Sequence, residues 1–188
     1  MNLKLDNVTS LSAARWAAAE GFTFLSFNFD KYSSSYIAPM QVAEICKWIN
    51  GVRFIGIFNN VEPLVIRDLY ELLNLVAIEL DLETAETLLI NHNIPGILQL
   101  NSENLKQGLE FKKYNRDVFA FSVNCLDILL NSLPLETCFI SQNTNPALLN
   151  VMPYGINFDS ENETEPGIAN FENLENSKNL WQTRFNRI

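Results

Sequence analysis

The chain is poor in the residues that build the commonest metal and nucleophilic sites. Its 188 residues include one histidine, His92, and three cysteines, Cys46, Cys125 and Cys138. A single histidine supports neither a His-dependent triad nor a zinc site of the usual kind. The cysteines are odd in number and have no metal or disulfide spacing, which favours a cytoplasmic protein. The sequence indicates no cofactor.

Positive charge and long apolar runs are also scarce. The chain has 13 Lys and Arg residues and 22 Asp and Glu residues, which gives a net charge of -9. Such a chain is a poor match for nucleic acid and for anionic membrane surfaces, both of which attract basic faces. No apolar run approaches the roughly 18 residues that span a bilayer, and Asp6 interrupts the N-terminal segment where a signal peptide would be apolar. We therefore expect a cytoplasmic protein with no nucleic-acid or membrane partner.

The composition otherwise fits an ordinary globular protein. Hydrophobic residues make up 47% of the chain and charged residues 19%, and no linker or low-complexity tract interrupts it. A chain of this length can bury a substantial core. We expect a single domain over 1–188.

The segment 21–60 contains a clear β-α-β unit. An aromatic strand at 22–29 is followed by a Ser-rich loop, a helix that opens at Pro39, and an apolar strand at 52–58. A strand, a crossover helix and a second strand within about forty residues indicate parallel strands with a right-handed connection.

The same alternation continues along the chain. We expect strands at 3–7, 22–29, 52–58, 75–80, 94–100, 117–123, 136–141 and 155–158. Helices are expected at 11–20, 39–50, from 63 onward, and at 83–90, 103–114, 126–130, from 146 onward and at 171–185. Eight strand–helix units favour an α/β fold of the closed (β/α)8 TIM-barrel type with short loops. Because such barrels usually have about 200 residues or more, an open sheet of six or seven strands is the alternative.

Four stretches in order resemble one family of barrel enzymes. LSFNF with SSSYIAP and QVAEI, then FIGIFNN, LVAIELD and finally PYGINFDSENETEPG with NFENL follow one another along the chain. Together they resemble phosphoribosylanthranilate isomerase, the barrel enzyme of tryptophan biosynthesis. The resemblance implies an Amadori rearrangement, in which a base takes the C2 proton of a phosphoribosyl amine, an acid protonates the ring oxygen, and backbone N–H groups hold the phosphate.

The residues expected from this resemblance are largely replaced. The family's base is the Cys of Lys-x-Cys-Gly-x-Thr, where this chain has Asp6, and its acid is an Asp whose nearest match is Ser122. The substrate-loop Arg is replaced by Ser35. In the family's Gln-Leu-His-Gly motif, Glu79 and Asp81 stand at the Gln and the His.

The phosphate grip implied by the resemblance is also altered. Where the family has Gly-Gly after the seventh strand and Ser-Gly after the eighth, this chain has Ser141, Gln142 and Asn143, then Ser160 and Glu161. Glycine permits close backbone approach to a phosphate, whereas the Glu161 carboxylate would repel it. The Gly-rich segment that follows the sixth strand in the family is missing.

The altered positions suggest two kinds of site at the barrel mouth. Asp6 is a candidate substitute base, or simply a carboxylate paired with Lys4 on the same strand face. With Glu79, Asp81 and Asp159 it could form a ring of carboxylates that suits Mg²⁺ or Ca²⁺; otherwise these are separate solvated charges at the rim.

Three further residues carry simpler expectations. Cys46 lies on a helix outside the barrel and is expected to pack rather than to act as a nucleophile. The aromatic residues of the opening unit are expected in the core, Trp48 included. Trp181, on the last helix, packs either in the core or at a subunit interface.

Three functional hypotheses follow. The first is an isomerase-like barrel that is catalytically degenerate or repurposed, with a partner or a small molecule at its mouth. The second is a working or weak isomerase that uses Asp6 as base, and the third is a cation-binding barrel. A homodimer stays open under each of them, and a fold carries no activity without its site residues.

Overall fold

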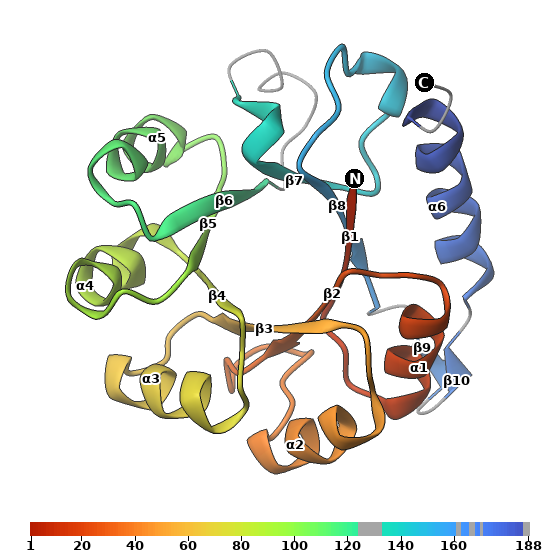
Figure 1. Ribbon diagram of the computed structural model, residues 1–188, viewed down its shortest axis with the longest axis horizontal. Helices are drawn as coiled ribbons and strands as arrows, with labels where there is room; N and C mark the ends of the chain where they lie inside the picture. The colour runs from red at the N-terminus through yellow and green to blue at the C-terminus, as the bar shows by residue number, and fades with distance from the viewer. Residues whose placement is uncertain (124–132, 161–162, 166–167, 170, 186–188) are drawn as a thin grey trace.

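The computed structural model describes residues 1–123, 133–160, 163–165, 168–169 and 171–185, and omits the side chains of 90–92, 163–165 and 168–169. Eight strands close into a barrel, in the order in which they occur in the chain (Figure 1). They are β1 (Asn2–Asp6), β2 (Phe24–Asn28), β3 (Arg53–Phe58), β4 (Ala77–Leu80), β5 (Gly96–Leu100), β6 (Val118–Val123), β7 (Cys138–Ser141) and β8 (Gly155–Asp159).

The closure is made by β1, which pairs in parallel with both β2 and β8. Lys4 aligns with Phe24 on one side and with Asn157 on the other. The predicted TIM barrel is confirmed, and the open sheet is excluded because no strand of the barrel is left as an edge.

Among the described residues, six α-helices lie outside the barrel (Figure 1). They are α1 (Leu11–Ala19), α2 (Pro39–Trp48), α3 (Pro63–Leu72), α4 (Leu82–His92), α5 (Leu105–Tyr114) and α6 (Glu172–Phe185). Ser10 caps α1 by accepting a hydrogen bond from the backbone N–H of Ala13 (3.2 Å), as expected of a serine at this position. Gly21 follows α1 with φ +77°, a conformation that glycine adopts without strain.

Several short elements differ from the predictions. The helix expected from Pro146 is a single 3-10 turn, η3 (Pro146–Leu148), and another, η2 (Leu135–Thr137), replaces the start of the predicted seventh strand. Two short antiparallel strands, β9 (Glu163–Glu165) and β10 (Ile168–Ala169), follow β8 and were not predicted. The helix predicted at 126–130, with Cys125 before it, lies outside the described residues.

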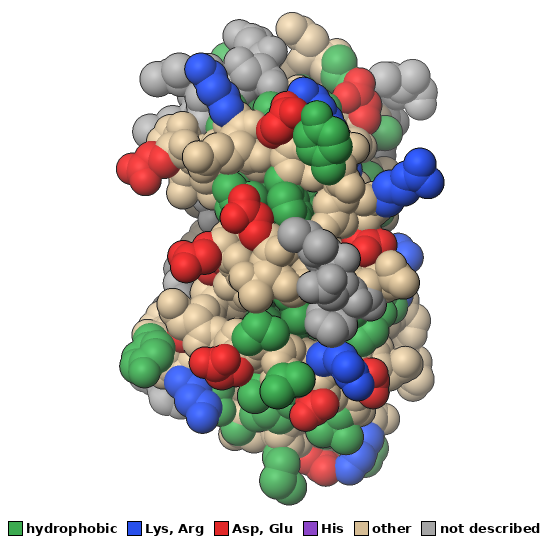
Figure 2. Space-filling model, turned by 90° about the vertical axis from the view of Figure 1, so that its left-hand side faces the viewer, with side chains coloured by type: hydrophobic (Ala, Val, Ile, Leu, Met, Phe, Trp, Pro, Cys, Tyr) green, Lys and Arg blue, Asp and Glu red, His purple; other side chains and the backbone are tan. Residues whose placement is uncertain are grey.

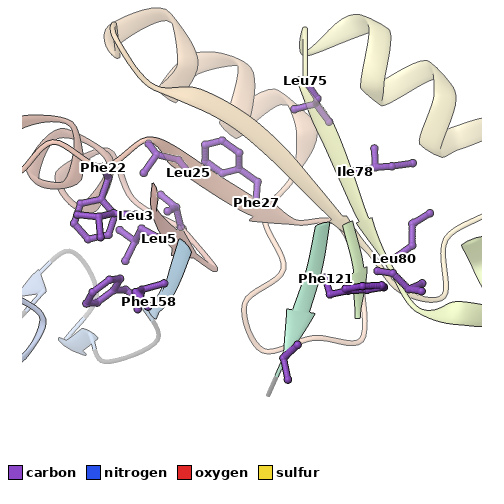
Figure 3. Close-up of a cluster of buried hydrophobic side chains, with 14 of the residues drawn as sticks. Leu3, Leu5, Phe22, Leu25, Phe27, Leu75, Ile78, Leu80, Phe121 and Phe158 are labelled. Carbon is purple, nitrogen blue, oxygen red and sulfur yellow. The ribbon is translucent and has the colours of Figure 1, made fainter. Parts of the chain in front are cut away.

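The hydrophobic core has two parts because strand side chains alternate between the two faces of the barrel wall. Outward-facing residues pack against the helices, as Figure 3 shows for Leu3, Leu5, Leu25, Ile78 and Leu80. A smaller cluster fills the lumen near the amino ends of the strands, and it comprises Phe24, Ile55, Ala77, Ile97, Ala120 and Phe139. The lumen is therefore packed at its amino end, and its polar residues lie towards the carboxyl end.

Trp48 departs from its expected position, and Trp181 agrees with one of its two expected positions. Trp48, expected in the core, is 64% exposed at the end of α2, where the Arg15 guanidinium lies 5.8 Å from its ring. Trp181, on α6, is fully buried, and its indole N–H donates to the backbone oxygen of Gln142 (3.2 Å). Of the two expectations for Trp181 the core is correct, and a role at a subunit interface is excluded because no part of the ring is exposed.

On the face that carries α4 and α5, acidic side chains are interspersed with Lys and Arg side chains (Figure 2). Within the part of the chain that the structure describes, no helix is both long and apolar enough to cross a membrane.

Candidate functional site

A polar layer lies in the lumen above its apolar cluster, towards the carboxyl ends of the strands. Inward-facing positions of neighbouring strands contribute it, and the strand registers place them side by side. Its members are Lys4, Asp6, Ser26, Glu79, Gln99, Ser122 and Asn157. Active sites of such barrels lie at this end, which makes the layer the candidate site.

Lys4 is the centre of this layer. Its side chain is fully buried, its ammonium group donates to the carboxylate of Glu79 across the lumen, and it lies 2.9 Å from Oδ1 of Asp6. The ammonium also lies 5.3 Å from the centroid of the Phe139 ring, in the apolar cluster below. The predicted pairing of Lys4 with Asp6 is confirmed, and Glu79 is a second, unpredicted partner.

The two carboxylates differ in their surroundings. Glu79 is buried and also accepts a hydrogen bond from Nε2 of Gln99 (3.4 Å). Asp6 accepts from the hydroxyl of Ser26, and its side chain is 14% exposed. Asp6 is therefore the member of the Lys4 cluster that meets the mouth.

Burial sets the protonation behaviour of this cluster. The loss of water raises the pKa of Asp6 to about 6; Lys4 and the Ser26 hydroxyl oppose the rise, and the Glu79 charge adds to it. Burial alone would lower the pKa of Lys4, but Asp6 and Glu79 together hold it above its ordinary value. Near neutral pH the lysine stays charged, while Asp6 can exchange a proton.

The other side of the layer is built by β6 and β8. The side-chain amide of Asn157 donates to the hydroxyl of Ser122 (2.9 Å), and both residues are buried. Ser122, at the position of the acid that the resemblance implies, is thus held by a neighbour and carries no acidic proton. The amide oxygen of Asn157 has no hydrogen-bond partner.

The predicted ring of four carboxylates does not form. Asp81 caps α4 by accepting from the backbone N–H of Thr84 (2.7 Å), and Glu79 is paired with Lys4. Asp159, at the end of β8, accepts from the side-chain amide of Asn7 (3.2 Å). The described residues include no group of three or more His, Cys, Asp or Glu side chains that could hold a metal ion. These residues therefore do not form the ring of carboxylates that we considered as a Mg²⁺ or Ca²⁺ site.

Backbone donors after β7 and β8 are engaged within the protein. The N–H of Gln142 donates to the backbone oxygen of Asn157 (2.8 Å), and that of Asn143 donates to the hydroxyl of Ser141 (3.3 Å). The N–H of Ser160 donates to the backbone oxygen of Asp6 (3.1 Å). Glu161 lies outside the described residues.

The other predicted positions play structural parts. Ser35 is buried in the loop after β2, and its backbone N–H donates to the hydroxyl of Ser33 (3.2 Å). Burial raises the pKa of the Cys46 thiol to about 11, so the thiolate needed for nucleophilic attack is scarce at neutral pH.

Sequence reasoning missed Ser26, Gln99 and Asn157 as parts of the site. Ser26 lies two residues from Asn28, and Asn157 lies two residues from Asp159, each pair in an otherwise apolar strand, whereas Gln99 is the single polar residue of β5. Polar residues at alternate positions of a buried strand face the same side, so this spacing marks the polar half of the lumen.

Several solved structures share this fold. A phosphoribosylanthranilate isomerase from Thermotoga maritima superposes with a TM-score of 0.77 at 17% identity, over 97% of this chain and 99% of its own. An isomerase solved in complex with reduced 1-(o-carboxyphenylamino)-1-deoxyribulose 5-phosphate gives 0.74 at 20% identity, over 98% of both chains. A structure of monomers generated from the dimeric Thermotoga maritima isomerase gives 0.72 at 19% identity, over 100% of both.

These similarities show that the chain has the fold of those isomerases over its whole length. No protein-family model matches the sequence. A search of curated proteins found no match either. The scaffold is therefore shared, while the sequence differs widely from those of the enzymes on which it superposes.

Proposed function

We propose that the chain is a divergent member of the phosphoribosylanthranilate isomerase family whose barrel has lost the isomerase reaction and binds a different ligand. The shared fold over the full length of the solved isomerases supports the family. The order of the four motifs along the sequence supports it independently.

The main support for the loss of activity is the hydrogen bonding of the polar side chains at the barrel mouth. The positions implied for base and acid hold Asp6, paired with Lys4 and Ser26, and Ser122, which accepts from Asn157. A general acid must give up a proton near neutral pH, and a serine hydroxyl does not do so. The Amadori rearrangement therefore lacks its acid.

Phosphate binding is also weakened. Phosphate sites depend on backbone N–H groups that point at the ligand. At the ends of β7 and β8 the N–H groups of Gln142, Asn143 and Ser160 already have acceptors in the protein. A phosphorylated substrate would have to displace these bonds next to the Asp6 and Asp159 carboxylates.

One observation favours the alternative of a working isomerase. Asp6 meets the mouth, and burial raises its pKa to about 6, which suits a general base near neutral pH. In that case Asp6 would take the proton for which the family uses its Cys, and the ring oxygen would need another donor.

Complementation separates the two functions. We expect the wild-type chain, expressed in a bacterial strain that lacks the isomerase, not to restore growth without tryptophan. A double variant, Asp6→Cys with Ser122→Asp, introduces the two implied catalytic groups and shows whether they alone are missing. Growth with the wild-type chain that disappears with Asp6→Asn would establish the isomerase and refute our proposal.

We further propose that the chain forms a homodimer, as the Thermotoga maritima protein does. Large apolar side chains are exposed at both ends of α2 and α3, namely Met40, Trp48, Leu64 and Leu72. Light scattering after size-exclusion chromatography measures the mass, which is 21.4 kDa for a monomer. A monomer mass at micromolar concentration would contradict this proposal.

A further inference from the structure

The mouth half of the lumen has more negative than positive charge. From the polar layer upward, the inward-facing positions of the eight barrel strands carry three carboxylates, Asp6, Glu79 and Asp159, and one ammonium group, Lys4. Lys4 lies beneath the mouth with no exposed surface, and it pairs with Asp6 and Glu79. A ligand entering from solvent therefore meets carboxylates first.

Two of these carboxylates are neighbours. Asp6 and Asp159 are partners in the register of β1 and β8 and face the same side of the barrel wall. Both are partly exposed at the carboxyl ends of their strands. A positive group that lies between two neighbouring carboxylates is attracted by both of them.

Unpaired acceptor atoms belong to residues near the carboxyl ends of three strands. Among the described residues, three buried side-chain atoms lack a hydrogen-bond partner, and all are amide oxygens: those of Asn59, Gln142 and Asn157. They belong to residues in, or directly after, β3, β7 and β8, at the mouth end of the barrel.

Asn157 is the most telling of the three. It is 6% exposed, it faces the lumen between Lys4 and Ser141 in the strand register, and its side-chain N–H already donates to Ser122. A buried acceptor without a donor is costly, so this oxygen requires an N–H or O–H from a ligand or from a water beneath it.

We propose that the barrel mouth binds a small organic cation with several N–H donors, a primary amine or diamine, whose ammonium group lies between Asp6 and Asp159. An anion would face the carboxylates, and a metal ion would need a convergence of ligands that the described residues do not provide. An ammonium group offers three donors that can reach acceptors spaced along the rim.

The proposal names the ligand class for the site of the proposed function and rests on that function. The probe is 1,4-diaminobutane, compared with 1,4-butanediol, which has the same length without charge, and with inorganic phosphate. Isothermal titration calorimetry on the full chain measures each Kd, and backbone ¹⁵N NMR locates the perturbed residues. We expect the diamine alone to bind, with shifts at Asp6, Asn7 and Asp159.

Two isosteric variants test the position. Asp6→Asn and Asp159→Asn should each weaken the diamine about tenfold, the effect of one lost charge-assisted hydrogen bond. Asp68→Asn, an exposed change on α3, is the matched control and should leave the Kd unchanged. Circular dichroism confirms that each variant is folded.

The outcomes separate this proposal from the one on which it rests. The amine site is refuted if the diamine does not bind, if the diol binds equally well, or if Asp68→Asn weakens binding equally. If the isomerase assay is also negative, these results leave the proposed function standing. Isomerase activity of the wild-type chain would overturn the proposed function, whatever the calorimetry shows. Binding that only Asp6→Asn and Asp159→Asn weaken supports the amine site.

Discussion

Replacing Asp6 by Asn should change how the stability of the protein depends on pH. The carboxyl has a pKa of about 6 in the folded protein and an ordinary value of 3.8. Because the folded state holds this proton more tightly, its stabilising contribution is complete below about pH 3.8. The contribution is lost as the pH rises through 6.

The size of the expected change in stability follows from the pKa shift of Asp6. A difference of about two pKa units at about 1.4 kcal/mol each amounts to about 3 kcal/mol. The side chain is only 14% exposed, so solvent screens this effect little. Asn cannot ionise but can still accept from Ser26, so the stability of Asp6→Asn relative to wild type should rise by about 3 kcal/mol between about pH 3.5 and pH 7.

Urea unfolding at half-unit pH steps measures this difference directly. Subtracting the variant from the wild type removes the titrations that both proteins share. Asp68→Asn, on the surface of α3, gives the baseline for an exposed carboxylate. If the free energies of unfolding of wild type and Asp6→Asn change with pH in the same way, the pKa of Asp6 in the folded protein is not raised to about 6 and the reasoning is refuted.

Three further substitutions test the packing around the site. Lys4→Met leaves the Asp6 and Glu79 carboxylates without their buried cation and should lower the free energy of unfolding in urea at pH 7 by about 3–5 kcal/mol. Lys47→Met removes an exposed ion pair and should lower it by less than about 1 kcal/mol. Equal losses would contradict the central role of Lys4. Trp181→Ala should lower the unfolding free energy by about 3–5 kcal/mol and Trp48→Ala by far less, and the reverse order would show that α6 packs differently. Gly56→Ala places a Cβ 2.3 Å from the Phe58 ring and should cost about 1–3 kcal/mol; an unchanged thermal midpoint would rule out that contact.

The barrel could be predicted from sequence because its signal is local and repeated. Each unit combines an apolar strand with a helix that starts at a recognisable residue, such as Ser10, Pro39 or Pro63. The short elements around β7 could not be predicted in the same way. Single 3-10 turns such as η3 depend on a few local bonds and leave little periodicity in the sequence.

The site was predictable only in part. The pairing of Lys4 with Asp6 follows from two residues on one strand face. The bond from Lys4 to Glu79 joins residues 75 positions apart, and only closure of the barrel brings them together. The position of Asp81 directly after its strand predicts a place at the mouth. Its carboxylate instead caps the N-terminus of α4, a role that aspartate commonly has.

The exposure of Trp48 has a similar explanation. A large aromatic residue is usually buried, yet at the end of α2 its ring lies at the surface against Arg15. The hydrophobicity of one residue does not fix its face on a helix; its position relative to Val42 and Ile45, the buried residues of α2, does.

The most direct test of the proposed loss of the isomerase reaction is turnover of phosphoribosylanthranilate by the purified chain at neutral pH, followed by the loss of substrate fluorescence. Because Ser122 supplies no acid and the backbone donors near β7 and β8 are engaged, the rate should equal the buffer background, with Asp6→Asn no different from wild type. Turnover above background that Asp6→Asn abolishes would contradict the loss of activity and establish Asp6 as the base of a working isomerase.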